Sequence, residues 1–243
     1  MMGDLVFIGD VHLEEGDPHL APFLAFLGRV GRTSRRIVLM GDLFNLWIGR
    51  RELEQPHQTA VLEKLTELRA GGVVVRYLEG NRDYRIAYGY AGRALDDSTE
   101  NPILERCGGL RLVAVHGDLA NPHDRKYRTW RRCSRSKAVW LLFNLLPRAR
   151  RLRFARGLED RMRSTNPEFK GEFPEAVVRD YAMSLLGPED DALVLGHFHI
   201  EKDLASAGAG SNARILVLPE WKSSRRHLRV DSAGDIAFVD SEF

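Results

Sequence analysis

The sequence has few cysteines, a small net charge and no long hydrophobic run. Its 243 residues include only Cys107 and Cys133, which form no CxxC pair and no disulfide framework. This pattern excludes a small disulfide-stabilised secreted fold and fits a reducing, cytosolic compartment. The formal net charge of +2 indicates no particular class of partner.

Segments that could cross or target a membrane are also lacking. The longest apolar run, residues 138–147, is too short to span a bilayer. A strand-like run lies within the first eight residues, and no basic region precedes a long apolar stretch, so we expect no signal peptide. There is no internal repeat or low-complexity linker, and the length suits one large domain or two small ones.

Five short apolar runs are each followed by a cluster of polar residues. Their length and β-branched content favour buried strands over fragments of helices. The runs and their clusters are LVFI (5–8) with GDVH, IVLM (37–40) with GDLFN, VVVRYL (73–78) with EGNRD, LRLVAV (110–115) with HGD, and ALVL (192–195) with GHFH. Helical spacing over residues 19–31 and 59–72 completes a β-α-β-α-β pattern. Because ligands bind beyond the carboxyl ends of strands in such folds, we expect the clusters to form a site.

These clusters contain side chains that commonly bind metals. Their donors are Asp10, His12, Asp42, Asn81, His116, His197 and His199. Mixed nitrogen and oxygen donors suit Mn²⁺, Fe²⁺ or Zn²⁺, and the lack of a cysteine argues against a structural zinc site. Seven donors are too many for one ion with an open position, but they suit two ions that share a carboxylate. Any one cluster is typical of a turn or helix cap, whereas five at successive strand ends favour a metal site.

The series GDVH, GDLFN, GNRD, HGD and GHFH resembles the motifs of the calcineurin-like metallophosphoesterase superfamily, in the same order. The resemblance runs from residue 4 to about residue 199. It implies an α/β fold, a four-layer αββα sandwich, as a single domain over residues 1–243. It also implies a dinuclear site in which Asp42 bridges two ions. The first ion would be held by Asp10, His12, Asp42 and His199, and the second by Asp42, Asn81, His116 and His197.

Within the superfamily the chain is most similar to the UDP-2,3-diacylglucosamine pyrophosphohydrolase family of lipid A biosynthesis. The similarity rests on GNRD in place of GNHE, the apolar NLWIG after GDLF, a basic helical insertion before GHFH, and a strand through LPEW that contains Trp221. Asn45 and Phe198 depart from the residues common in that family. The alternative from the motifs alone is a metal-dependent phosphodiesterase acting on another nucleotide diphosphate or on nucleic acid.

This narrower resemblance implies a specific reaction and place in the cell. Water would attack the α-phosphorus of UDP-2,3-diacylglucosamine and release UMP and 2,3-diacylglucosamine 1-phosphate. Two divalent ions, preferably Mn²⁺, would be the cofactors. The partners would be this UDP-linked acylated sugar and the cytoplasmic face of the inner membrane, where the protein would bind peripherally, and no nucleic acid is expected.

Residues from about 120 to 187 interrupt the α/β pattern and are predicted to form a helical cap. Residues 125 to 163 contain 14 Lys or Arg and two acidic residues. Such a segment can be a solvated helical face, a nucleic-acid groove with Trp130 and Phe154 as stacking candidates, or a cap for an amphiphilic substrate. The apolar run at 138–146 beside several arginines favours a cap at an anionic membrane surface.

Arg82 stands in GNRD where superfamily members commonly have histidine. Cleavage of a pyrophosphate releases a phosphate with a second pKa of about 6, which needs charge neutralisation more than protonation. A guanidinium can bind phosphate oxygens in a bidentate way, so Arg82 is predicted to clamp the diphosphate, the alternative being an ion pair with a carboxylate such as Asp83. The predicted catalytic residues are Asp42, Asn81 and Arg82. The resemblance further implies substrate contacts by Arg82, Asp124, Tyr127, Arg161, Ser164 and Lys170.

Overall fold

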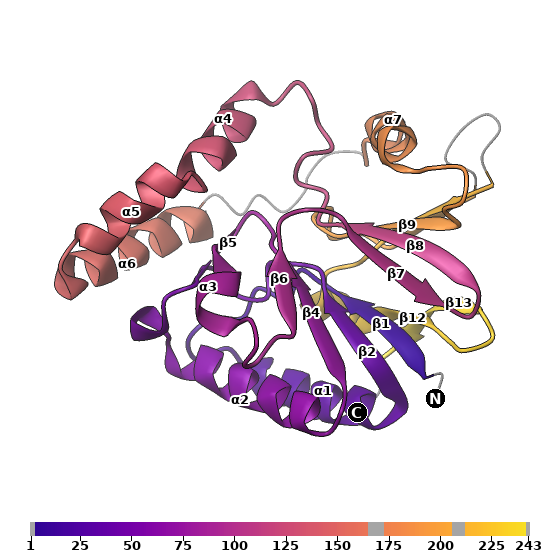
Figure 1. Cartoon of the computed structure of the whole chain (residues 1–243), viewed down its shortest axis with the longest axis horizontal. Helices are drawn as coiled ribbons and strands as arrows, with labels where there is room; N and C mark the ends of the chain where they lie inside the picture. The colour runs from indigo at the N-terminus through magenta and orange to yellow at the C-terminus, as the bar shows by residue number, and fades with distance from the viewer. Residues whose placement is uncertain (1–2, 165–172, 206–211, 242–243) are drawn as a thin grey trace.

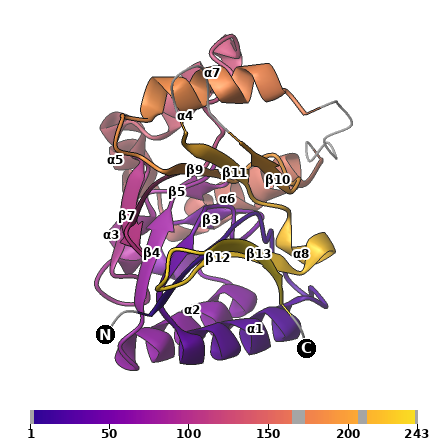
Figure 2. The ribbon, with the colours of Figure 1, turned by 90° about the vertical axis from the view of Figure 1, so that its right-hand side faces the viewer.

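Two β-sheets packed face to face form the centre of the computed structural model, which describes residues 3–164, 173–205 and 212–241. Helices α1 (Leu20–Thr33) and α2 (Pro56–Ala70) cover the outer face of one sheet. Helix α7 (Glu175–Leu185) covers the outer face of the other, so the layers run helix, sheet, sheet, helix (Figures 1 and 2). The predicted α/β, four-layer αββα sandwich is therefore confirmed.

The first sheet has four parallel strands and an antiparallel hairpin at one edge. Its order is β13 (Ile236–Asp240), β12 (Arg226–Val230), β1 (Asp4–Ile8), β2 (Ser34–Leu39), β4 (Val74–Leu78) and β6 (Asp97–Thr99). Strands β1, β2, β4 and β6 are parallel neighbours, and β12 pairs antiparallel with β1. The carboxyl ends of β1, β2 and β4 therefore lie together at one edge of the sheet.

The second sheet places two further strand ends at the same edge of the sandwich. Its order is β10 (Lys202–Leu204), β11 (Arg214–Val217), β9 (Ala192–Leu195), β8 (Leu110–Val115) and β7 (Ile103–Cys107). The central strands β8 and β9 are parallel. Two short strands, β3 (Trp47–Ile48) and β5 (Asp83–Tyr84), pair with each other outside both sheets.

Strand β9 shows why these strands read as continuous apolar runs. Alternate residues of a strand face opposite sides of a sheet. Val194 is buried between the two sheets, whereas Leu193 and Leu195 are buried against Val178 and Ala182 of α7. A strand that is covered on both faces needs apolar residues at every position, which removes the polar alternation seen in half-exposed strands.

The prediction of a strand through LPEW is wrong for the last residues of that strand. Strand β11 ends at Val217, and Trp221 begins a short helix, α8 (Trp221–Ser224). Pro219, which lacks the N–H that a strand ladder needs, follows the strand closely. Trp221 is fully buried against the ring of Phe23 in α1, with ring centroids 5.0 Å apart, and its Nε1 donates to Ser241 Oγ.

Helices α4 (Arg125–Ser134), α5 (Lys137–Leu145) and α6 (Arg148–Ser164) form an arm that projects beside the sandwich (Figure 1). Side chains of Asp124 and Ser136 cap the first two helices by accepting from backbone N–H groups. The arm contacts the body through a small apolar cluster in which Trp140 and Phe143 pack against Ile48 and Tyr84. Helix α7, which the prediction placed in the same cap, lies on the second sheet instead of in the arm. None of the helices within the described ranges is long and apolar enough to cross a membrane.

A buried carboxylate joins the two sheets and gives a first testable prediction. Glu105 on β7 lies 2.7 Å from Arg36 Nη1 on β2 and 2.9 Å from Arg76 Nη1 on β4. Removal of this carboxylate by Glu105→Ala leaves two half-buried guanidinium groups facing each other. We expect the free energy of unfolding to fall by about 2 kcal/mol, less than for a fully buried pair because both arginines are partly exposed. Urea denaturation measures this change.

The matched control is Glu189→Ala, which removes an exposed partner of Arg111 at 2.8 Å. Because exposed ion pairs contribute little, its effect should stay below about 0.5 kcal/mol. Equal effects of the two substitutions would show that Glu105 does not hold the sheets together.

Candidate active site

The seven predicted donors lie beyond the ends of five strands at one edge of the sandwich. Asp10 and His12 follow β1, Asp42 follows β2, and Asn81 follows β4 in the first sheet. His116 follows β8, and His197 and His199 follow β9 in the second sheet. The structure brings all seven into two adjoining groups.

The first group consists of Asp10, His12 and His199, whose ligand atoms lie within 4.8 Å of one another. The Nε2 atoms of His12 and His199 are 3.1 Å apart, and Asp10 Oδ1 lies 4.0 and 3.5 Å from them, respectively. Ligands about 2.1 Å from one cation lie roughly 3 to 3.5 Å from each other. The three side chains therefore fit a shared metal ion.

The second group is built around Asn81. Its Oδ1 lies 3.0 Å from His116 Nε2 and 3.1 Å from His197 Nδ1. His116 Nδ1 donates to the Met40 carbonyl at 2.8 Å, which turns the other ring nitrogen toward the site. The amide oxygen and two imidazoles therefore fit a second ion.

Asp42 lies between the two groups. Its Oδ2 is 4.0 Å from His12 Nε2 in the first group and 3.8 Å from His116 Nε2 in the second. Asp10, Asp42 and His116 also place ligand atoms within 4.8 Å of one another. A carboxylate at this position is suited to contact two ions at once.

The charges of these groups fit divalent cations. Burial lowers the pKa of His12 to about 3 and that of His197 to about 4, so both imidazoles are neutral, the form that binds metals. Burial tends to raise the pKa of Asp10, but the neighbouring histidines, His199 foremost, more than offset this and leave Asp10 ionised. Burial and the nearby Asp10 carboxylate raise the pKa of Asp42. A cation between the two carboxylates would relieve this repulsion.

Most of the donors have an unusual backbone conformation. Asp10, His12, Asp42, His197 and His199 have φ between 50° and 72°, a left-handed region that non-glycine residues rarely adopt. They make up five of the seven such residues within the described ranges. Conformations of this kind each cost of order 1 kcal/mol and are typical of functional sites.

Two glycines allow the turns that carry Asp42 and Asn81 to approach each other. A Cβ on Gly80 would lie 2.3 Å from Asp42 Oδ1 and 2.7 Å from His116 Cε1. Gly41 has φ +88°, and a Cβ there would lie 2.7 Å from Gly80 N. The glycines of GDLFN and GNRD are therefore required by close packing at the site.

Asp83, which sequence analysis named only as a possible ion-pair partner of Arg82, holds the same two turns together. Its Oδ2 accepts from Asp42 N at 2.9 Å, from Gly80 N at 2.8 Å and from the Tyr77 hydroxyl at 2.8 Å. Sequence reasoning did not identify Tyr77, which lies in a strand that reads as core. The sequence feature that points to Asp83 is its position in the GNRD motif, two residues after Asn81.

Arg82 is buried beside the donors. Its backbone N donates to Asp42 Oδ1 at 2.9 Å, and its charge acts to lower the pKa values of Asp42 and His12. The guanidinium therefore lies close enough to the donor groups to influence a phosphate bound there.

The predicted substrate contacts are not gathered as the metal donors are. Asp124 caps α4 by accepting from Tyr127 N at 2.9 Å, and the Tyr127 hydroxyl donates to Asp118. Both side chains thus have partners near the start of the arm. Ser164 is the last residue of α6, and Lys170 lies outside the described residues.

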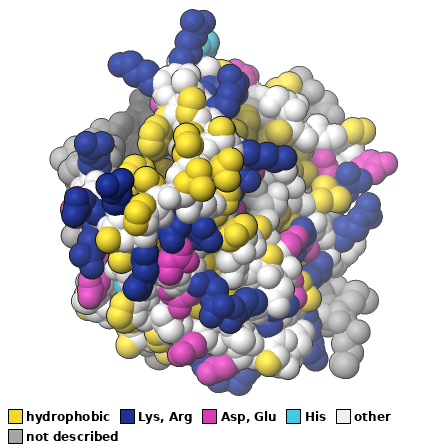
Figure 3. Space-filling model, turned by 60° about the vertical axis from the view of Figure 1, so that its left-hand side comes forward, with side chains coloured by type: hydrophobic (Ala, Val, Ile, Leu, Met, Phe, Trp, Pro, Cys, Tyr) yellow, Lys and Arg dark blue, Asp and Glu magenta, His cyan; other side chains and the backbone are white. Residues whose placement is uncertain are grey.

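An apolar cavity of about 810 Å³ lies between the arm and the body. Its wall includes Ile48, Tyr84, Trp130, Phe143, Phe154 and the predicted contact Arg161. The Tyr84 hydroxyl lies 3.5 Å from the carbonyl oxygen of Asn81, so the cavity begins close to this donor residue. Figure 3 shows this side of the molecule, where hydrophobic side chains gather among Lys and Arg.

Two curated relatives align with nearly the whole chain. The protein from Stenotrophomonas maltophilia strain K279a is 30% identical over 237 residues, covering 94% of this chain and 95% of the relative. The protein from Aromatoleum aromaticum is 30% identical over 232 residues and covers 94% of each chain. Both are named UDP-2,3-diacylglucosamine hydrolase. The chain belongs to the UDP-2,3-diacylglucosamine hydrolase family.

Membership of the UDP-2,3-diacylglucosamine hydrolase family confirms the resemblance inferred from the motifs. No family model matches the chain. Among solved structures, GAP50 of Plasmodium aligns with a TM-score of 0.47 at 12% identity, covering 98% of this chain and 84% of that one.

Proposed function

We propose that the protein hydrolyses UDP-2,3-diacylglucosamine to UMP and 2,3-diacylglucosamine 1-phosphate in lipid A biosynthesis. The observation that carries this proposal is the complete set of seven donors at five strand ends, in a chain of this hydrolase family. The apolar cavity beside the site supports an acylated substrate, because acyl chains need a large dry surface.

The donors are proposed to hold two divalent ions. Asp10, His12, Asp42 and His199 would hold one, and Asp42, Asn81, His116 and His197 the other. Mn²⁺ is the preferred ion, since the donors are nitrogen and oxygen atoms without a thiolate. Such ions supply neutralisation of phosphate charge and acidification of a water molecule.

The proposed reaction breaks one phosphorus–oxygen bond of the diphosphate, and Arg82 assists it. Water attacks the α-phosphorus, and the bond from this phosphorus to the bridging oxygen breaks, which leaves the sugar 1-phosphate. Arg82 binds the phosphate oxygens and stabilises the charge that develops on them. A phosphate leaving group needs little protonation at neutral pH, so no histidine is needed at position 82.

The arm is proposed to hold the acyl chains and to bring the protein to the membrane. Asp124, Tyr127, Arg161, Ser164 and Lys170 stay predicted substrate contacts. Helix α5 exposes Leu141, Leu142 and Leu145, and arginines begin α6 directly after it. An apolar surface bordered by basic residues is suited to the anionic cytoplasmic face of the inner membrane.

This membrane proposal gives a second prediction. The double variant Leu142→Glu/Leu145→Glu places charge on the apolar surface of α5, where Leu145 is 72% exposed. We expect binding to phosphatidylglycerol vesicles to weaken about tenfold or more, because two leucine side chains can no longer enter the bilayer. Sedimentation with vesicles measures this. Leu104→Glu, on β7 of the body, is the control and should bind as wild type; equal binding by all three proteins would contradict a role for α5.

The direct test is an assay of the purified protein with UDP-2,3-diacylglucosamine and Mn²⁺, in which UMP is separated by chromatography. Release of UMP that stops on addition of a chelator and returns with Mn²⁺ is the expected result. Absence of UMP together with hydrolysis of another phosphodiester would refute the substrate and retain the metal site.

A further inference from the structure

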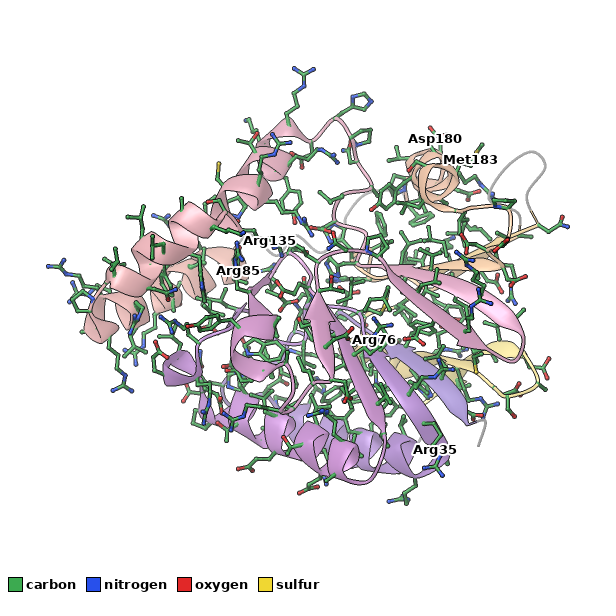
Figure 4. All side chains as sticks on the ribbon, in the orientation of Figure 1. Arg35, Arg76, Arg85, Arg135, Asp180 and Met183 are labelled. Atoms are coloured by element: carbon green, nitrogen blue, oxygen red, sulfur yellow. The ribbon has the colours of Figure 1, made fainter. Side chains whose placement is uncertain are left out.

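Arg135 joins the arm to the turn that carries Asn81 and Arg82. It follows the last residue of α4, yet its side chain is only 6% exposed. Its Nη2 donates to the carbonyl of Gly80 and, at 2.9 Å, to the carbonyl of Asp83. Figure 4 shows Arg135 beside Arg85, between the arm and the body. The guanidinium therefore binds the two carbonyls that flank Asn81 and Arg82.

Further contacts hold the guanidinium in this place. Its central carbon lies 5.7 Å from the ring centroid of Tyr84, and its Nε lies 3.4 Å from Glu100 Oε2. The backbone carbonyl of Arg135 accepts from Arg85 Nη2, so contacts run in both directions between the arm and the body. The junction of α4 and α5 is thereby fixed to the turn.

The turn is held from a second direction by Asp83. The Asp83 carboxylate accepts from the N–H groups of Asp42 and Gly80, while Arg135 binds the carbonyls of Gly80 and Asp83. Asp83 ties the turn to the neighbouring donor, and Arg135 ties it to the arm. A shift of α4 would consequently move the backbone of the turn.

We propose that Arg135 is a positioning residue through which the arm sets the place of Asn81 and Arg82. This positioning role rests on the proposed function, in which Asn81 holds a metal ion and Arg82 binds the diphosphate. A lysine cannot take its place fully, because Nη2 alone binds both carbonyls while Nε lies beside Glu100 and the planar group lies over the Tyr84 ring, and a single ammonium nitrogen cannot make all of these contacts. A lipid substrate held against the arm would thereby also bear on the position of the catalytic turn.

The test compares Arg135→Ala and Arg135→Lys with the control Arg132→Ala, which removes an exposed arginine in the last turn of α4. Each protein is assayed with UDP-2,3-diacylglucosamine and with bis(4-nitrophenyl) phosphate, which has no acyl chain to place under the arm. Mn²⁺ affinity is measured by calorimetric titration and folding by thermal denaturation. For Arg135→Ala we expect kcat to fall about 100-fold with both substrates and Mn²⁺ binding to weaken about tenfold. The kcat values and Mn²⁺ affinity of Arg135→Lys should lie between those of Arg135→Ala and wild type. Those of Arg132→Ala should match wild type.

A role in substrate anchoring alone would give a different pattern. If Arg135→Ala raises KM for the lipid substrate and leaves kcat for the aryl phosphodiester and Mn²⁺ affinity unchanged, the proposal is overturned. If the alanine variant does not fold, the same comparison is made with Arg135→Lys, which keeps the charge. Should the wild-type protein fail to release UMP, the proposed substrate fails, while the aryl phosphodiester and Mn²⁺ measurements still decide the role of Arg135.

Discussion

Replacement of Asp42 by asparagine is expected to lower kcat/KM by about 10³-fold or more, equivalent to ~4 kcal/mol in the barrier. Asp42 Oδ2 lies between the two donor groups, 4.0 Å from His12 Nε2 and 3.8 Å from His116 Nε2. Asparagine has the same shape but no charge, so two cations would face each other without the anion between them. Steady-state kinetics with UDP-2,3-diacylglucosamine measures the loss.

Metal content separates this explanation from misfolding. Asp42 Oδ1 accepts from Arg82 N, a contact that the asparagine oxygen can keep, so the fold should survive. Elemental analysis should find close to two Mn²⁺ per wild-type chain and at most one in Asp42→Asn. The control Asp203→Asn, which removes an exposed partner of Arg214 in the second sheet, should bind and react as wild type. Full metal content with full activity in Asp42→Asn would refute the bridging role.

The place of the donors could be read from the sequence because it depends on short-range pattern. An apolar run that ends in a polar residue marks the end of a buried strand, and parallel strands bring such ends to one edge of a sheet. Asp10, Asp42 and Asn81 follow three neighbouring parallel strands, so their proximity follows from the order of β1, β2 and β4. The GDVH and GHFH clusters added donors at the ends of β1 and β9.

The contacts between the arm and the body could not be predicted from a short-range sequence pattern. Arg132 and Arg135 are alike in type and close in sequence, but one is exposed and the other is buried against carbonyls 52 and 55 residues earlier in the chain. Composition predicted a basic helical segment and gave no sign of which arginine enters the body. Trp221 was misplaced for a related reason, since its partner Phe23 lies in α1 at the other end of the sequence.

Backbone conformation at the site was beyond sequence reasoning as well. Positive φ is expected for glycine, yet Asp10, Asp42 and His199 adopt it. Tertiary hydrogen bonds impose it, as when His12 N donates to the Asp42 carbonyl and Asp42 N donates to Asp83. The preference of these residues for negative φ is overridden because the ends of β1 and β2 must bring their polar side chains close to each other.

Loss of the Arg82 side chain is expected to lower kcat/KM more for a diphosphate substrate than for a simple phosphodiester. Arg82→Ala should lower kcat/KM for UDP-2,3-diacylglucosamine by about 10² to 10³-fold, the usual effect of removing one group that stabilises developing charge. The variant keeps the backbone N–H that donates to Asp42 Oδ1, so Mn²⁺ binding should change little. The loss with bis(4-nitrophenyl) phosphate should be smaller, because that substrate has no second phosphate for the guanidinium to bind.

Variants at the same position test why arginine stands there. Arg82→Lys keeps a positive charge and should recover part of the lost activity, whereas a point charge cannot replace bidentate contact with two oxygens. Arg82→His restores the residue common in the superfamily, and a neutral imidazole should recover less on the diphosphate than lysine does. A histidine variant as active as wild type would mean that proton donation, rather than charge, limits the reaction. Equal losses with both substrates in Arg82→Ala would instead assign Arg82 to the structure of the donor site.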